Sequence, residues 1–246
     1  MVKDGQMDPK WLEWARTIQA LAQNGLAYSE GPFDRERYEA LREIAIEMLA
    51  MQADDDVARL RGLFREEKGY ATPKVDVRGV VFADGKILLV QERRDMKWTL
   101  PGGWVDVFDR PSRAAEREVR EESGYEVRAT KLLALWDRSL HGHPPSLHAI
   151  YKAFFRCELL GGAPRRSIET ADVGFFAEDA LPELSLPRTT PSEIARMFEH
   201  LRHPDWPLDA WDGLRRLMLL ELDLFHAAVA GRAGAKLSGG VPTTGM

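Results

Sequence analysis

The chain of 246 residues contains a single cysteine, Cys157, and this scarcity excludes several classes of protein. One cysteine cannot form an intramolecular disulfide, and it cannot supply the cluster of thiolates found in structural zinc sites. A chain without a disulfide framework is typical of a reducing compartment. We therefore expect a cytoplasmic protein.

Long apolar runs and an excess of basic charge are also absent. No run of about 18 apolar residues occurs, which argues against a membrane-spanning helix, and the N-terminus has no apolar core typical of a signal peptide. The 39 acidic and 34 basic residues give a formal net charge of -5. This balance disfavours a general grip on DNA or on anionic lipid, although it leaves room for a local basic site.

The first part of the chain has the pattern of amphipathic helices. Apolar residues recur at spacings of three and four in segments 9–23, 34–49 and 57–64, as one face of a helix requires, and Asp34 can cap the second helix. These segments carry no catalytic grouping. We therefore expect residues 1–68 to form a small all-helical packing or oligomerisation domain.

Two tryptophans of the first helix, Trp11 and Trp14, bear on the state of assembly. A domain of this size buries little apolar surface by itself, so the tryptophans favour packing against a partner subunit. We expect a homodimer. Packing on the second domain of the same chain is the alternative.

After Pro73 the apolar pattern changes to that of strands. Residues 75–90 alternate around a turn and indicate a hairpin, and Pro111 is suited to the first position of a helix that ends before Gly124. Further strands are expected over 127–136, 147–158 and 173–176, and further helices after Pro191 and over 214–225. We expect an α/β domain over residues 69–205, followed by a C-terminal helix and a disordered tail within 206–246.

The residues that indicate chemistry lie in the helix expected before Gly124. Glu118, Glu121 and Glu122 stand at i, i+3 and i+4, so their carboxylates share one helix face, near the end where the helix dipole disfavours anions. A solvated charge run is the ordinary explanation of such acids. A bound divalent cation would offset both their repulsion and the dipole, and Mg²⁺ prefers such ligands.

The spacing from these acids to the preceding glycines favours the metal. The chain resembles the Nudix family, whose signature is G-x5-E-x7-R-E-U-x-E-E-x-G-U, where U is apolar. One position departs from it, because Asp109 replaces the first glutamate, and we expect Asp109 to be a loop residue beside the helix N-terminus rather than a metal ligand. The matching residues are Gly103, Arg117, Glu118, Val119, Glu121, Glu122, Gly124 and Tyr125.

The resemblance implies an α/β/α Nudix sandwich with a mixed sheet, of the subfamily that adds a helical N-terminal domain and acts on X-linked nucleoside diphosphates. It implies that Mg²⁺, or Mn²⁺ instead, is held by the three glutamates and by the Gly102 carbonyl, and that Arg117 orients the acids. A loop acid, Glu169, is a candidate for an extra ligand or for the general base, with a surface role equally compatible.

Other residues are candidates for substrate contact. Trp98 and Trp104 can stack on a base, although large aromatic residues are more often core, and Arg93 and Arg94 can hold phosphate, although solvated surface arginines are more common. Three histidines flank a Gly-Pro-Pro turn and suggest a loop beside the leaving group rather than a metal site. They are His141, His143 and His148.

These features predict a Mg²⁺-dependent hydrolase that cuts the diphosphate of a nucleoside diphosphate linked to another group, such as ADP-ribose, a CDP-alcohol or a sugar nucleotide. A nucleoside triphosphate pyrophosphatase remains an alternative. A nucleotide-sensing regulator is a second alternative, but all three acids are present and the N-terminal helices lack a basic stripe for DNA. A purely structural protein would leave the gathered acids unexplained.

Overall fold

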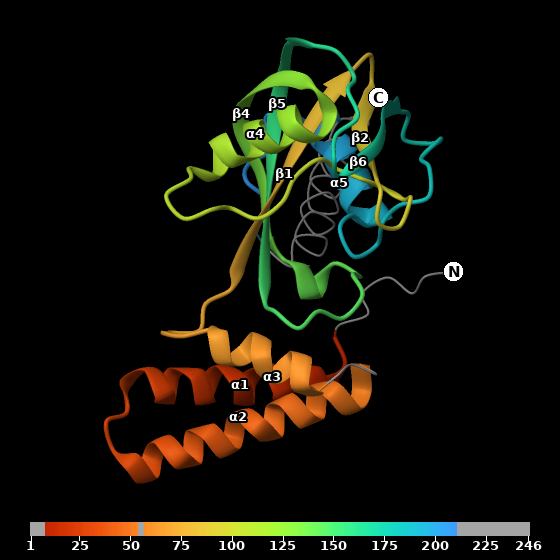
Figure 1. Cartoon of the computed structure of the whole chain (residues 1–246). Coiled ribbons are helices and arrows are strands. Elements are labelled where there is room, and N and C mark those ends of the chain that lie inside the picture. The colour runs from red at the N-terminus through yellow and green to blue at the C-terminus, as the bar shows by residue number, and fades with distance from the viewer. Residues whose placement is uncertain (1–7, 54–56, 211–246) are drawn as a thin grey trace, which may run out of the picture. The chain divides into compact units, whose positions relative to one another are not determined.

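The computed structural model describes residues 8–53 and 57–210, and its N-terminal part is helical as predicted (Figure 1). Apolar residues from all three helices pack into one small core, which includes Leu12, Ile46 and Phe64. The helices are α1 (Lys10–Tyr28), α2 (Pro32–Ala53) and α3 (Val57–Glu66).

Two details of the helical prediction are wrong. Helix α1 continues past Gln23 to Tyr28, because Gly25 leaves room for the Tyr38 ring of α2, which would collide with any side chain at position 25. Helix α2 begins at Pro32, whose fixed φ suits the first turn of a helix, so Asp34 lies inside the first turn rather than at the cap.

The second part of the described chain is built on a mixed sheet, as predicted. Strand β1 pairs in parallel with β5 and antiparallel with β2, and the strand order is β3-β2-β1-β5-β4, with β6 also paired to β2. Strand β1 therefore joins the two halves of the sheet. The strands are β1 (Lys74–Ala83), β2 (Lys86–Glu92), β3 (Trp98–Thr99), β4 (Tyr125–Asp137), β5 (Ile150–Gly162) and β6 (Thr170–Phe176).

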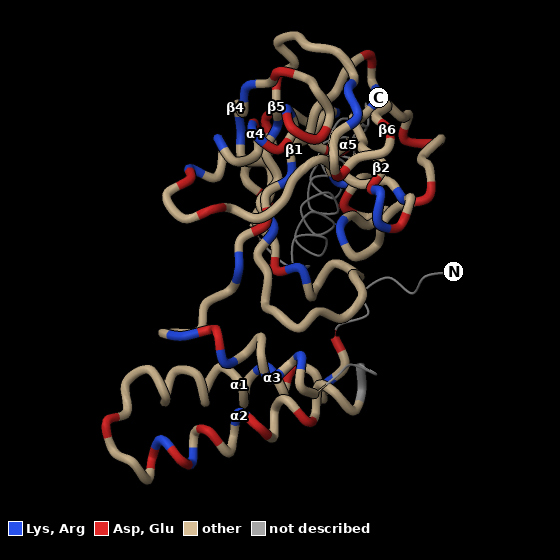
Figure 2. Tube along the Cα trace, viewed as in Figure 1, with Lys and Arg blue, Asp and Glu red and all other residues tan. Residues whose placement is uncertain are grey.

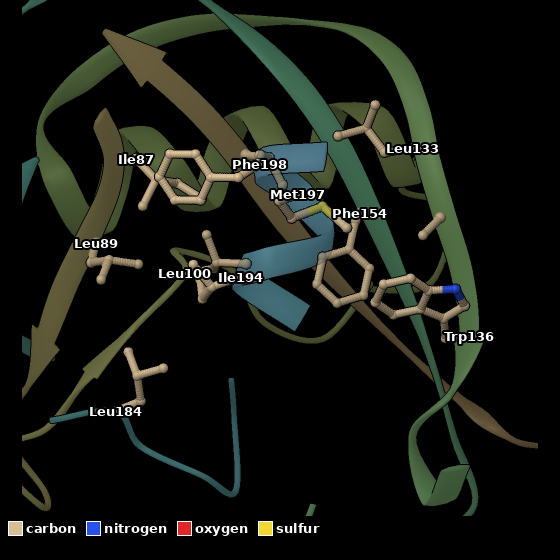
Figure 3. Packing of buried hydrophobic residues seen from close by; sticks show 12 residues of the cluster. Ile87, Leu89, Leu100, Leu133, Trp136, Phe154, Leu184, Ile194, Met197 and Phe198 are labelled. Carbon is tan, nitrogen blue, oxygen red and sulfur yellow. The ribbon is translucent and has the colours of Figure 1, made fainter. Parts of the chain in front are cut away.

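A helix covers each face of this sheet. Helix α4 (Pro111–Ser123) packs Val119 against one face, where the missing side chain of Gly79 lets the helix approach β1 closely. Helix α5 (Pro191–Arg202) packs Ile194 and Phe198 against the other face, in the largest apolar cluster (Figure 3). The layers are helix, sheet and helix.

The predicted strands 127–136, 147–158 and 173–176 exist but have shifted bounds. Strand β5 starts later than predicted because Leu147 packs against the helical core instead, and it ends later because Gly162 still pairs with Tyr125 of β4. The helix predicted over 214–225 and the tail after it lie outside the described residues. Within the described ranges no helix has the length and apolar character needed to span a membrane.

Candidate active site

Helix α4 presents its acids to the loop that follows β3. The apolar side of the helix is buried on the sheet through Ala115 and Val119, which turns Glu118 and Glu122 toward Gly102 and Gly103. Figure 2 marks the acidic and basic positions along this helix. Two of the three predicted acids thus converge on the glycine pair.

Glu122 is buried, with 5% of its surface exposed, and its Oε2 accepts a 2.9 Å hydrogen bond from the Gly102 amide. Burial raises the pKa of Glu122 to about 8, against the opposing charge of Arg78. A carboxylate in this position is poorly stabilised by the protein alone. It would ionise readily only if a further cation came close.

The charge of the Arg78 guanidinium opposes the effect of burial on Glu122, but this guanidinium is already shared with other partners. It is buried on β1 and donates two hydrogen bonds to Asp76, of 3.0 and 2.9 Å, and one of 3.0 Å to the Leu100 carbonyl. Burial acts to lower the pKa of Arg78, but Asp76 raises it above its ordinary value. Arg78 therefore anchors Leu100, at the start of the loop that contains Gly102 and Gly103. Because it is shared in this way, it balances the charge of Glu122 only in part.

Glycine at position 102 is required by the backbone. Its φ of 149° favours glycine, and a side chain there would collide with the Val77 carbonyl of β1. The Gly103 carbonyl accepts a 2.8 Å hydrogen bond from Val77, so the loop is pinned to the strand edge. This places the Gly102 peptide against the Glu122 carboxylate.

Glu118 lies against the second glycine. A methyl group at Gly103 would stand 3.3 Å from a Glu118 carboxylate oxygen, which is contact distance. Burial raises the pKa of Glu118, and the charges of Glu121 and Glu169 act in the same direction while Arg117 opposes them. Glu121 itself points outward, with 53% of its side chain exposed.

Arg117 lies among the acidic residues. Its guanidinium is 2.8 Å from Glu118, 3.2 Å from Asp109 and 3.4 Å from Glu121. Although burial acts to lower it, these carboxylates raise the pKa of Arg117. Asp109 is therefore a partner of Arg117 in the loop before α4.

The loop before β6 lies near the C-terminal end of α4, since the Thr170 hydroxyl donates a 2.7 Å hydrogen bond to the Glu122 carbonyl. A depression with a volume of about 460 Å³ opens here, and both predicted arginines, Arg93 and Arg94, line it together with Glu169. The Glu169 carbonyl accepts a 2.9 Å hydrogen bond from the Arg93 amide. The rest of the lining is Glu92, Ile168 and Arg188.

The predicted tryptophans are not gathered in one place. Trp98 packs edge-on to Phe176, with ring centroids 4.7 Å apart, which is a core contact. Trp104 is half exposed beside the glycine pair, where it forms a bridge with Asp76. Of the two, Trp104 is the more exposed, and it directly follows Gly103 in the chain.

The histidines do not meet in a common site. His143 is buried against Glu193 at 2.8 Å, His148 lies edge-on to Phe64, and His141 stacks on the buried Trp136. Each contact ties the loop between β4 and β5 to another part of the fold. A role beside the leaving group, as the sequence suggested, finds no support in these contacts.

Sequence reasoning missed several polar residues of this region. Glu92 and Arg188 form a 3.0 Å ion pair in the depression, and Arg78 lies behind the acids. Lys152 and Glu193 form a buried ion pair of 2.7 Å on the α5 side of the sheet. The two ion pairs carry no local signal in the sequence, because the partners in each pair are more than 40 residues apart.

The donor set suits a hard divalent cation. Across residues 8–53 and 57–210 no three acid, histidine or cysteine side chains stand close enough to close a metal shell alone. Mg²⁺, however, usually binds through one or two carboxylates and completes its shell with water and substrate phosphate. Glu118, Glu122 and the Gly102 carbonyl meet this need, and a cation there would balance the buried Glu122.

Comparison with known proteins places this geometry in a family. Residues 72–201 match the NUDIX domain, over half of the chain. The chain belongs to the Nudix family. Residues 9–64 match a second Nudix-associated domain, described as a UDP-X-like N-terminal oligomerisation domain. The chain is thus a Nudix hydrolase with a helical N-terminal domain, as the resemblance to that family implied.

Relatives share this arrangement over most of their length. A Bacillus subtilis (strain 168) protein named "Putative ADP-ribose pyrophosphatase YjhB" is 45% identical over 81% of this chain and 96% of its own. The crystal structure of a UDP-X diphosphatase is 33% identical, with a TM-score of 0.53, over 81% of this chain and 98% of that one. An ADP-ribose pyrophosphatase from Streptococcus suis 89-1591 is 39% identical, with a TM-score of 0.52, over 57% of this chain and all of that one.

Proposed function

We propose that this Nudix hydrolase cuts the diphosphate of nucleoside diphosphates linked to a further group, with Mg²⁺ or, in its place, Mn²⁺. The observation that carries the proposal is the meeting of Glu118 and Glu122 at the Gly102–Gly103 turn. The products would be a nucleoside monophosphate and a phosphorylated second product. ADP-ribose is our first candidate, because two of the relatives are named for it and together they align with most of the chain.

We propose as metal ligands the three glutamates of α4 and the Gly102 carbonyl. Glu118 and Glu122 are already directed at the glycine pair, whereas Glu121 is exposed. When bound there, the metal would neutralise diphosphate charge and acidify a water. Arg117 would hold Glu118 and Glu121 in place through its contacts of 2.8 and 3.4 Å. The buried Glu122 has the most to gain from a cation, because Arg78 and the hydrogen bond from the Gly102 amide only partly offset its desolvation.

We assign the general base to Glu169. Its loop precedes β6, where the Thr170 hydroxyl donates a 2.7 Å hydrogen bond to the Glu122 carbonyl, and the charge of Glu169 acts to raise the pKa of Glu118. Glu169 is exposed, so it can reach a water at the edge of the site and return the proton to solvent. Arg93 and Arg94 would bind the substrate in the adjoining depression, and Trp104 offers an exposed ring for stacking.

We further propose that the protein is a homodimer assembled through its N-terminal helices. Trp14, Leu21 and Tyr28 recur every seven residues along α1 and are 55%, 59% and 72% exposed. On α2, Ile44 and Met51 repeat the spacing with 48% and 80% exposed. An apolar stripe on each helix is typical of self-association, and the family model for this region describes an oligomerisation domain.

A substrate panel tests the proposal. Purified protein is incubated with ADP-ribose, CDP-choline, a sugar nucleotide and a nucleoside triphosphate, each with Mg²⁺, with Mn²⁺ and with chelator, and the phosphate released by an added phosphatase is measured. We expect at least one linked diphosphate to be cut only with metal. Hydrolysis of triphosphates alone would overturn the substrate class, and full activity in chelator would overturn the metal.

A further inference from the structure

The depression beside the acids contains an ion pair that the proposed reaction has not used. Glu92 and Arg188 line its floor, and Arg188 Nε is 3.0 Å from Glu92 Oε1. Glu92 is 7% exposed, and its charge acts on Glu122 of the acid cluster. The Arg93 amide, next to Glu92, donates a 2.9 Å hydrogen bond to the Glu169 carbonyl, and the neighbouring Thr170 hydroxyl donates one of 2.7 Å to the Glu122 carbonyl. The ion pair is therefore connected by short contacts to the helix that carries the acids.

Arg188 is the arginine of the depression that the protein holds most firmly. Besides Glu92, its guanidinium approaches the Ser185 hydroxyl at 3.4 Å and Asp95 at 3.9 Å, and only 28% of its side chain is exposed. These contacts involve Nε and Nη1, so they cannot occupy all five N–H donors of the guanidinium. Arg93 and Arg94 are exposed by comparison.

The backbone at Arg188 is fixed from inside the fold. Its carbonyl accepts a 2.6 Å hydrogen bond from the buried Lys152, which is paired with Glu193. The next residue, Thr189, accepts a 3.2 Å hydrogen bond from the Leu100 amide, two residues before Gly102. Arg188 is thus tied to the same backbone that presents the proposed metal ligand, which is how a preorganised binding residue is supported.

We propose that Arg188 binds a phosphate of the substrate diphosphate, with Glu92 as the residue that positions it. A diphosphate approaching α4 meets three carboxylates, and it needs cationic groups beyond the metal to offset them. A guanidinium fixed along its Nε edge can offer its remaining donors to phosphate oxygens in the forked geometry that arginine favours. The assignment rests on the proposed function, because it requires that the acids serve a diphosphate.

The test is calorimetric titration of the full-length protein with α,β-methylene-ADP, a diphosphate that cannot be cut at its bridge, in the presence of Mg²⁺. We expect Arg188→Ala to weaken binding roughly 10- to 100-fold, the loss typical of charge-assisted hydrogen bonds, and Arg188→Lys to weaken it several-fold. Arg202→Ala is the matched control, because Arg202 pairs with Glu178 on the surface, and its binding should stay within about twofold of wild type.

Two further readouts separate a binding role from a structural one. Mg²⁺ alone should raise the thermal midpoint of Arg188→Ala as much as that of wild type, and steady-state kinetics should show a raised KM with kcat changed far less. If Arg188→Ala does not fold, the titration of Arg188→Lys decides the question.

Binding within twofold of wild type in either Arg188 variant would overturn the assignment. Failure of the proposed function would give a different result. The wild-type protein would bind the analogue and Arg188→Ala would not, but wild type would release no monophosphate from any linked diphosphate.

Discussion

Replacing Glu122 by glutamine should stabilise the metal-free protein at alkaline pH while nearly abolishing turnover. Glutamine keeps an oxygen that can accept the Gly102 hydrogen bond, but it removes a charge that is buried with little compensation. Because burial raises the pKa of Glu122 from 4.5 to about 8, the unfolded state releases this proton first as pH rises. The Glu122 carboxyl therefore lowers the free energy of unfolding of wild type as pH rises from 4.5 to about 8. Glu122→Gln lacks this contribution.

The magnitude follows from proton linkage. One pKa unit corresponds to about 1.4 kcal/mol, so the shift predicts that wild type loses about 2–3 kcal/mol relative to the variant between pH 6 and pH 9. Taking the difference between the two proteins removes the titration of groups that they share, including Lys152, whose pKa burial lowers to about 8.

The assay is urea unfolding of wild type and Glu122→Gln at pH 6 and pH 9, in chelator and then in Mg²⁺. In chelator, the free energy of unfolding of Glu122→Gln should exceed that of wild type by more at pH 9 than at pH 6. In Mg²⁺, metal binding should raise the free energy of unfolding of wild type, while that of the variant should change little. Glu121→Gln is the matched control, because it makes the same change of side chain on the same helix at a position that is 53% exposed, and we expect Glu122→Gln to gain more stability in chelator than this control. A stability difference that is equal at both pH values would refute the reasoning about burial.

Three further outcomes are expected. Asp109→Asn should lower kcat by less than about fivefold in steady-state assays, because Asp109 is one of several carboxylates that pair with Arg117. A loss equal to that of Glu122→Gln would instead make Asp109 a metal ligand. Trp14→Lys should convert a dimer to a monomer in light scattering at micromolar concentration; a wild-type monomer would end the dimer proposal. Lys152→Met should cost about 3–5 kcal/mol in urea unfolding, because it leaves Glu193 buried without its ion-pair partner, and an unchanged midpoint would contradict the pairing.

The parts of the site that could be predicted from sequence are those built by local rules. Glu118 and Glu122 share a face of one helix because of the helical repeat, and the spacing back to Gly103 follows from a contiguous loop and helix. The mixed sheet and its helices were likewise predicted from apolar periodicity together with the family resemblance. The predicted bounds of α1 and β5 were less accurate, because they depend on contacts of Gly25 and Leu147 with other elements of the fold.

The parts that could not be predicted depend on tertiary contacts. Arg188 meets Glu92 across 96 positions, and nothing near either residue marks the pair. Lys152 meets Glu193 only because β5 and α5 pack on the same face of the sheet. Trp98 and Trp104 are similar in sequence context, and only the fold separates a core residue from an exposed one.

The central claim concerns the bond that is cut, and hydrolysis in oxygen-18 water tests it most directly. With ADP-ribose and Mg²⁺, we predict that mass spectrometry finds AMP and ribose 5-phosphate in equal amounts, with one labelled oxygen on one phosphorus and none in chelator. Label on a phosphate released from triphosphates alone, with ADP-ribose and CDP-choline both intact, would contradict the account.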